Sequence, residues 1–281
     1  MTSEILSYIV WNPDPVIFRI GDFGLRWYSS LWCLGLVAGY FIVRWLYRRE
    51  GMKSELFEPL FLYCFTGVLI GGRLGHCLFY QPDYFLASWD HIVEMFLPIR
   101  KGMDGWHFTG YEGLASHGGV FGMLIAYWIY TRRYHVSIWF VLDCVGIAAP
   151  FTACCIRLGN LMNSEIIGRV TDVPWAFIFE HVDHVPRHPG QLYEALFYLL
   201  VGIVGLALYF SVCKRKVGTG FFFGYCIGVI FTFRFFIEFL KEVQEDFEEG
   251  LLLDMGQLLS LPLIVLGIAC MIGGKWMEKY K

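Results

Sequence analysis

Residues 218–240 read GTGFFFGYCIGVIFTFRFFIEFL, an apolar run interrupted by only two charged side chains, Arg234 and Glu238. A helix that crosses the hydrocarbon core of a bilayer needs about 20 mostly apolar residues, and this run supplies them. Similar runs predict seven membrane-spanning helices, at residues 27–47, 57–80, 113–131, 137–157, 191–212, 218–240 and 251–274. The sequence therefore predicts an all-α polytopic membrane protein, with residues 1–281 forming a single integral-membrane domain.

Composition supports the same class. Of the 281 residues, 57% are hydrophobic and 17% are charged, whereas soluble domains have about 45–50% apolar and about 25% charged residues. The net charge of −3 gives no reason to expect a nucleic-acid partner. Residues 1–26 lack the basic segment followed by an apolar one that marks a cleavable signal peptide.

The placement of basic residues predicts an orientation. Lys and Arg gather after the first, third and fifth apolar runs and in the C-terminal tail, whereas residues 241–249 are acidic. Because cytoplasmic loops carry an excess of Lys and Arg, we predict an N-terminus outside and a C-terminus in the cytoplasm. The long outer segments 81–112 and 158–190 are rich in aromatic residues, so we expect them to form a small folded periplasmic head.

The nine cysteines fall mostly within apolar runs, and no two of them are spaced as a CxxC pair. Cysteine in such a setting behaves as a small hydrophobic residue. We therefore expect these cysteines to be structural, and the sequence predicts no metal site and no cofactor.

Several charged or polar residues interrupt the outer halves of the apolar runs, where such groups are costly and often functional. Arg73 lies in the run Gly71–Gly75 and fits a buried ion pair or a snorkelling side chain as well as a site role. His117 is flanked by Ser116 and two glycines that leave room for a ligand, and histidine titrates near neutral pH.

The densest polar run is Arg157–Gly168, which reads RLGNLMNSEIIG. It supplies a guanidinium that matches phosphate oxygens, together with amides and a carboxylate. The motif His188–Glu194 opens the fifth span and fits a helix start as well as a site. Arg234 and Glu238 are four residues apart and share a helix face. An outward cluster of these groups suits an anionic lipid headgroup.

These motifs together resemble the prolipoprotein diacylglyceryl transferase family of bacteria. The resemblance covers nearly the whole chain and rests on Arg26-Trp27-Tyr28, Gly71–Gly75, Ser116–Gly119, Arg157–Gly168, His188–Glu194, Arg234 with Glu238, and Met255-Gly256-Gln257. It implies an inner-membrane enzyme, with its active site toward the periplasm. That enzyme would move the sn-1,2-diacylglyceryl group of phosphatidylglycerol to the lipobox cysteine of a preprolipoprotein, forming a thioether and releasing glycerol 1-phosphate.

The resemblance also implies roles for residues. The positions expected to be catalytic are His117, Arg157, Arg234 and Glu238. The positions expected to bind phosphatidylglycerol are Tyr28, Arg157, Asn160, Glu165, Gly168, His188, Glu194 and Arg234. Two stretches depart from the family pattern, because Ala153-Cys154-Cys155-Ile156 stands where many relatives have glycines and Ile230 stands where some have tyrosine.

The chemistry suggests how these residues divide the work. A free thiol has a pKa near 8.5 and needs help to attack carbon, so His117 is a candidate base or, alternatively, a headgroup ligand. We expect Arg157 and Arg234 to hold the phosphate, Glu165 and Glu238 to orient the guanidiniums, and Asn160 to hold the headgroup.

Three other functions fit parts of the pattern. An anion transporter would use the same arginines but needs polar residues through both leaflets, and the cytoplasmic half is apolar. A phosphatidyl transferase needs carboxylates that hold a divalent metal, and the acidic residues here are not clustered in DxxD-type sets. A non-catalytic assembly factor gives no reason for paired arginines.

Overall fold

The computed structural model describes residues 8–21, 23–102, 105–108, 113, 115–211, 217–242 and 253–277. The chain divides into two compact units. The larger unit comprises residues 1–46 and 139–281, and the smaller unit comprises residues 47–138.

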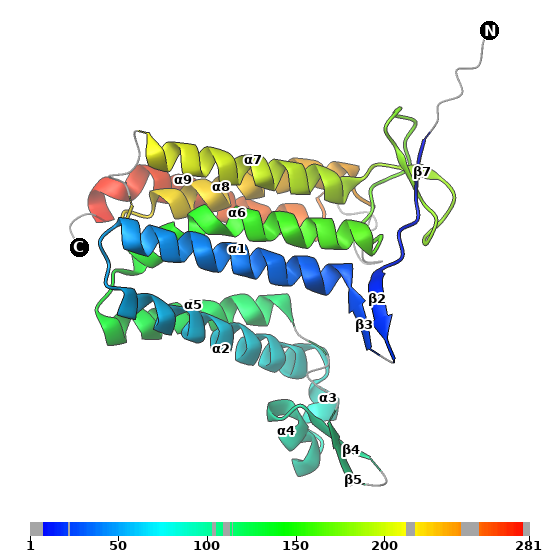
Figure 1. The fold of residues 1–281 in the computed structure, drawn as a ribbon, viewed down its shortest axis with the longest axis horizontal. Helices are drawn as coiled ribbons and strands as arrows, with labels where there is room; N and C mark the ends of the chain where they lie inside the picture. The colour runs from blue at the N-terminus through cyan, green and yellow to red at the C-terminus, as the bar shows by residue number, and fades with distance from the viewer. Residues whose placement is uncertain are drawn as a thin grey trace. The chain divides into compact units, whose positions relative to one another are not determined.

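The larger unit is built on long helices that run side by side (Figure 1). They are α1 (Trp27–Arg49, which continues into the smaller unit), α6 (Ile138–Met162), α7 (Gly190–Phe210), α8 (Phe221–Ile237, extended by a 3-10 turn at Glu238–Leu240) and α9 (Met255–Met277). Helices α8 and α9 approach closely because Gly224 and Gly267 face one another. A Cβ atom on Gly224 would lie 2.6 Å from the carbonyl oxygen of Gly267.

A small sheet lies at one end of these helices. Its strands are β1 (Ile9–Trp11), β6 (Phe177–Phe179) and β7 (Pro186–Arg187), in the order β1-β6-β7. Strand β1 runs parallel to β6, and β6 runs antiparallel to β7. The apolar core beneath the sheet consists of Leu161, Ile167, Phe177 and Phe179. A separate hairpin, β2 (Val16–Ile20) and β3 (Phe23–Arg26), leads directly into α1.

The smaller unit pairs α2 (Phe57–Gly75) with α5 (Ser116–Tyr134). Between them along the chain lie a π-helical turn (His76–Tyr80), α3 (Pro82–Phe85), α4 (Trp89–Phe96) and the hairpin β4 (Ile99–Gly102) and β5 (Gly105–Phe108). The two long helices touch through glycines, because a Cβ atom on Gly75 would lie 2.8 Å from the Cα atom of Gly118. Such small residues allow close approach of membrane helices.

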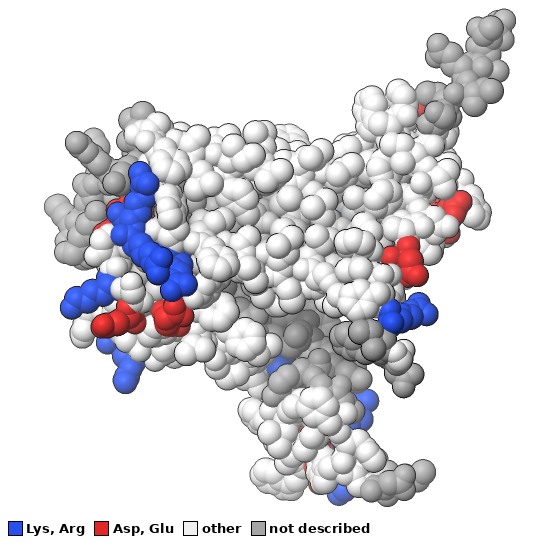
Figure 2. Space-filling model, in the orientation of Figure 1, with Lys and Arg blue, Asp and Glu red and all other residues white. Residues whose placement is uncertain are grey.

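Six helices in the described part of the chain are long and apolar enough to cross a membrane, which confirms a polytopic membrane protein. They are Trp27–Arg49, Ser54–Tyr80, Ile138–Met162, Gly190–Phe210, Phe221–Leu240 and Met255–Gly273. The seventh expected span, 113–131, overlaps the helix α5 (Ser116–Tyr134) but is not among these six. The count of seven and the orientation therefore stay predictions. Figure 2 shows that the visible face of the larger unit is largely free of Lys, Arg, Asp and Glu side chains between the two ends of its helices.

One expected boundary was wrong in a way that matters for the site. The fourth span was expected to end at residue 157, but α6 continues to Met162. Arg157 and Asn160 therefore lie on the last turns of a helix, three residues apart and on one face.

Candidate active site

The end of α6 presents polar side chains in a fixed arrangement. Arg157 Nη1 donates to Asn160 Oδ1 at 3.3 Å, and Asn160 Nδ2 donates to Glu165 Oε2 at 3.1 Å. Asn163 Nδ2 donates to Glu165 Oε1 at 3.1 Å. Two residues of the turn that follows α6, Ser164 and Ile166, have φ angles of 55° and 57°. This left-handed backbone is unfavourable for a β-branched residue, and such conformations gather at functional sites.

A buried carboxylate on α7 pairs with Arg157. Glu194 has no exposed surface, and its Oε2 atom lies 3.0 Å from Arg157 Nε. The Tyr198 hydroxyl, one helical turn further on, donates to Glu194 Oε1 at 3.0 Å. We expected Glu165 to orient the Arg157 guanidinium, but Glu194 makes the direct ion pair. Glu165 connects to Arg157 through Asn160.

Lys241 follows α8 and its 3-10 turn, and it joins two carboxylates. Its ammonium donates to Glu194 Oε1 at 3.2 Å and lies 2.8 Å from Glu238 Oε2. Glu238 Oε1 in turn lies 4.0 Å from Arg234 Nη2. The result is a continuous chain of charges, Arg157–Glu194–Lys241–Glu238–Arg234, which we call the charge chain. The charge chain itself holds three cations and two carboxylates, and the Glu165 carboxylate lies beyond Arg157, linked to it through Asn160.

The sequence did not single out Lys241. It stands at the start of the acidic segment 241–249 and reads there as a solvated loop residue. The structure instead buries it, with 3% of the residue exposed. The signal that could have found it is its spacing, since a residue three positions after Glu238 stays on the same face when a helical turn continues.

Gly168 and Arg169, which follow the turn after α6, bind the backbone of Leu240 and Lys241. We call this arrangement the clamp. Gly168 and Lys241 form an isolated antiparallel bridge. The Arg169 backbone N–H donates to Leu240 O at 2.8 Å, and its Nε donates to Lys241 O at 2.8 Å. A Cβ atom on Gly168 would lie 2.9 Å from Leu240 O and would also meet His188. Glycine at this position therefore lets two segments close on Lys241.

His188 lies beside the clamp. The Gly168 backbone N–H donates to His188 O at 3.0 Å, and His188 Nδ1 lies 3.2 Å from the Tyr193 hydroxyl. Trp175 Nε1 donates to the same hydroxyl at 2.8 Å. Burial lowers the pKa of the His188 imidazole below its usual value, which favours the neutral ring near pH 7.

Arg187 ties the sheet to the same region. Its Nη2 atom lies 2.6 Å from Asp183 Oδ2, and its Nη1 atom lies 3.1 Å from Glu242 Oε1. The hydrogen bond from Arg187 lowers the pKa of the Asp183 carboxyl. Arg187 Nη1 also donates to Gly168 O at 3.2 Å. The ion pairs of Arg187 therefore connect Asp183 and Glu242 to the clamp.

Tyr28 and Gly256 complete the larger unit's part of the site. Tyr28, the second residue of α1, packs its ring against Gly159 of α6, where a Cβ atom would lie 3.0 Å from Tyr28 Cδ2. Gly256 of α9 packs against the Glu238 carboxyl group, where a Cβ atom would lie 2.7 Å from Glu238 Cδ. The structure thus brings together nine of the ten expected site residues within one unit, the exception being His117.

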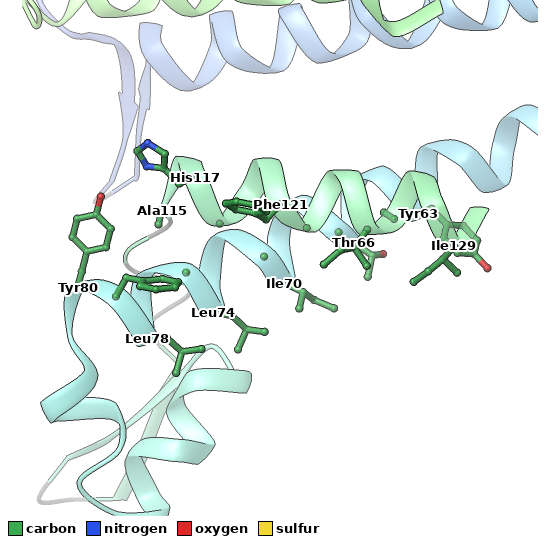
Figure 3. Close-up of a pocket in the computed structure, with 18 of the residues that line it drawn as sticks. Tyr63, Thr66, Ile70, Leu74, Leu78, Tyr80, Ala115, His117, Phe121 and Ile129 are labelled. Carbon is green, nitrogen blue, oxygen red and sulfur yellow. The ribbon is translucent and has the colours of Figure 1, made fainter. Parts of the chain in front are cut away.

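His117 and Arg73 belong to the smaller unit. His117 is exposed near the start of α5 and lines an apolar groove of about 1090 Å³ along α2 and α5. Figure 3 shows His117 and Tyr80 at one end of this groove and Ile129 toward the other. Arg73 is buried and donates to the backbone carbonyls of Glu94 at 2.8 Å and Met95 at 3.3 Å, which supports a structural role.

The sequence profile of prolipoprotein diacylglyceryl transferases matches residues 15–273. The chain belongs to this family. Three curated relatives are named phosphatidylglycerol–prolipoprotein diacylglyceryl transferase. The protein of Bacteroides fragilis is 52% identical over 95% of both chains, that of Tolumonas auensis is 40% identical over 94% of this chain and 96% of its own, and that of Chloroherpeton thalassium is 41% identical over 93% and 92%.

The two stretches expected to depart from the family pattern lie close together in the structure. Cys154 of α6 packs with Ala195 and Tyr198 of α7 in one apolar cluster, and Ile230 of α8 packs against that cluster. The two departures therefore contact the same part of the core. Tyr198, whose hydroxyl donates to Glu194, packs against the apolar side chains of Cys154 and Ile230.

Proposed function

We propose that this chain transfers the diacylglyceryl group of phosphatidylglycerol to the lipobox cysteine thiol of a preprolipoprotein. Membership in the diacylglyceryl transferase family supports the reaction. The charge chain is the observation that carries the site, because preorganised cations are what a departing phosphate requires.

The bond changes define what the site must stabilise. The thiol sulfur forms a bond to C3 of the glyceryl group while the C3–O bond to phosphate breaks. The thiol proton leaves, and the phosphodiester becomes a phosphomonoester, glycerol 1-phosphate, with one more ionisable oxygen. Negative charge therefore grows on the leaving group as the reaction proceeds.

Arg157 and Arg234 are proposed to hold that phosphate. Arg157 has its Nε atom committed to Glu194, which fixes the plane of its guanidinium. Arg234 remains about one-third exposed at the side chain, so it can reach a ligand. Lys241 is proposed to position both arginines, because it holds the carboxylates of Glu194 and Glu238 with which they pair.

The roles of the other residues follow from their contacts. Asn160 and Glu165 form a hydrogen-bonded pair at the C-terminal end of α6. They are proposed to bind the glycerol hydroxyls of the headgroup. Tyr28, Gly168 and His188 are proposed to shape the headgroup site. His117 is proposed as the base for the incoming thiol or as a headgroup ligand. A pH–rate profile that His117→Gln leaves unchanged would exclude the first of these roles.

The membrane arrangement belongs to the same proposal. We infer that α5 is the seventh span, that the N-terminus faces outward and the C-terminus the cytoplasm, and that the site opens toward the periplasm of a bacterial inner membrane. We also infer that residues 1–281 act as a single domain, with 81–112 and 158–190 forming its outer head. Alkaline phosphatase fused after Lys281 should be inactive, whereas activity there would reverse the orientation.

The reaction is tested directly with purified protein in detergent. The protein receives phosphatidylglycerol and a lipobox peptide with one cysteine, and mass spectrometry follows the peptide. We expect a gain of one diacylglyceryl group on that cysteine and none on a Cys→Ser peptide. Folded protein that binds the lipid but gives no mass gain would contradict the proposal and favour an anion transporter.

A further inference from the structure

Between α2 and α5, the described residues of 82–108 form a compact element that we call the arm. Its inner side is fixed to α2. Arg73 donates to the carbonyls of Glu94 and Met95, and its guanidinium lies 4.9 Å from the centre of the Phe85 ring. Phe85 and Met95 pack with Cys77 into a buried apolar cluster. The arm is therefore tied to the end of α2 by both polar and apolar contacts.

The polar groups on the inner side of the arm are satisfied. The Glu94 carboxylate is buried, accepts the Tyr84 hydroxyl at 2.8 Å and accepts the Lys101 backbone N–H at 2.9 Å. Asp90 at the start of α4 pairs with Lys101 Nζ at 2.6 Å. The charges beside α4 thus compensate one another within the arm.

The outer side of α4 is apolar. Trp89 and Val93 are four residues apart on α4, so they share one helix face, and they are 82% and 38% exposed. Leu97, in extended backbone directly after the helix, is 48% exposed. Leu86, just before the helix, is 58% exposed. Aromatic content in this segment led us to expect a folded head. The described residues of this segment form α3, α4 and the β4–β5 hairpin, but Trp89 is exposed and lies outside the buried apolar cluster.

The position of the arm along the chain sets its depth. The second membrane-spanning segment ends at Tyr80, and the arm begins two residues later at Pro82. Arg73 of α2 donates to the carbonyls of Glu94 and Met95 in the last turn of α4. That turn therefore lies close to the end of the second membrane-spanning segment. Tryptophan is enriched at the boundary between headgroups and acyl chains, and an amphipathic helix there buries its apolar face by about 5–10 Å.

We propose that the arm lies in the outer lipid interface, with Trp89, Val93 and Leu97 inserted among the headgroups and upper acyl chains. The partner of this face is a lipid surface, recognised through apolar burial and not through charge. Arg73 is then the residue that holds the arm at this depth, which gives the motif Gly71–Gly75 a structural task.

The test measures the depth of the Trp89 indole in the intact protein. Wild-type protein and Trp89→Phe are reconstituted into phosphatidylcholine vesicles whose acyl chains carry bromine either near the headgroup or near the chain end. The difference in tryptophan emission between the two proteins isolates Trp89. Trp175→Phe is the matched control, since Trp175 of the larger unit is 55% exposed and outside the arm.

We expect bromine near the headgroup to remove most of the Trp89 emission, with less loss from bromine near the chain end and little from aqueous iodide. High salt should leave the pattern unchanged. Strong quenching by iodide would place Trp89 in water and overturn the proposal. Quenching by neither agent would mean that protein, such as a second copy of the chain, covers this face, and would overturn it as well. The readout does not depend on transferase activity.

Discussion

The ammonium group of Lys241 donates a hydrogen bond of 3.2 Å to Oε1 of Glu194, a carboxylate with no exposed surface. The other oxygen of that carboxylate faces Arg157. A single buried carboxylate therefore lies between Arg157, the cation that we assign to the phosphate, and Lys241, which follows α8 and its 3-10 turn. Buried charges persist only when they are paired, and loss of either cation leaves the Glu194 carboxylate with one ion-pair partner in place of two.

Arg157→Gln should abolish diacylglyceryl transfer. Glutamine keeps a polar group but no charge, and removal of one preorganised donor to a developing anion costs about 10²–10³-fold in kcat. The mass-spectrometric assay measures the loss, and membrane insertion is checked by fractionation. Normal transfer by an inserted Arg157→Gln protein would contradict the assignment of Arg157 to the phosphate.

Lys241→Met should lower kcat by about 10²-fold, because misplacement of catalytic groups by about 1 Å has that effect. Lys241→Arg should restore much of the rate, since it keeps the charge between Glu194 and Glu238. A purely structural role would lower the melting temperature of both variants without this rescue. Lys101→Met is the control, because Lys101 pairs with Asp90 on an exposed surface, and its kcat should stay unchanged.

The double variant Lys241→Met with Glu238→Gln tests the coupling within the charge chain. In the single variant Lys241→Met, the Glu238 carboxylate loses its ion pair of 2.8 Å with Lys241, and the second change removes that carboxylate. We expect the two changes to be non-additive in the free energy of unfolding, as is usual for residues in one ion-pair network. Strict additivity would show that Lys241 and Glu238 act independently.

The residues that the sequence predicted well are those whose chemistry is costly in a membrane. Arg157, Arg234 and Glu238 stood out because charges in apolar runs need partners, and the structure places all three in one chain of ion pairs. Lys241 escaped prediction because it lies just beyond an apolar run, where a lysine is ordinary. Its burial depends on the clamp at Gly168, a tertiary contact between segments more than 70 residues apart along the chain.

The ion-pair and hydrogen-bond partners of the charged residues were harder to predict from the sequence than the charged residues themselves. The pairing of Arg157 with Glu194 and not Glu165 joins α6 to α7, and sequence spacing favours the nearer carboxylate. The role of Arg73 stayed open for the same reason. Its acceptors are the carbonyls of Glu94 and Met95. Every residue has a backbone carbonyl, so the sequence does not indicate which ones accept from Arg73. Helix positions within the larger unit, by contrast, followed directly from apolar runs.

Gly168→Ala should reduce activity strongly while Gly205→Ala should not. The added methyl group at Gly168 would meet His188 and the Leu240 carbonyl at 2.9 Å, whereas at Gly205 it would meet the Tyr225 ring at an ordinary 3.4 Å. Overpacking of this kind costs about 1–3 kcal/mol and should open the clamp on Lys241. Transfer rates and melting temperatures of the two variants give the comparison, and equal activity would contradict a clamp that depends on Gly168.

Asp143→Asn should destabilise the protein without a specific effect on catalysis. Asp143 is fully buried and accepts the backbone N–H groups of Gly218, Thr219 and Gly220 on Oδ2 and that of Phe223 on Oδ1. The amide of asparagine would turn an N–H group toward these donors. Unsatisfied buried donors cost about 1–3 kcal/mol. Thermal unfolding in detergent measures the change, with the exposed Asp90→Asn as control.

His188 should make stability depend on pH in the mildly acidic range. Burial lowers the pKa of its imidazole in the folded state, whereas the unfolded value is near 6.5. Below the unfolded pKa the unfolded chain binds a proton that the folded chain resists, so stability falls as pH drops through 6.5 and levels off below the folded pKa. At neutral pH and above, both states hold the ring neutral and the effect vanishes.

His188→Gln should flatten this part of the stability profile, because glutamine does not titrate. Melting temperatures of both proteins between pH 5 and 8 would show a gap that changes with pH only on the acidic side. Asp183, whose pKa Arg187 lowers, loses its contribution to stability only as the pH falls below the unfolded carboxyl pKa of about 3.9. It therefore does not affect the comparison of the two proteins in the measured range. Parallel profiles for the two proteins across the whole range would show that burial of His188 does not oppose its charge.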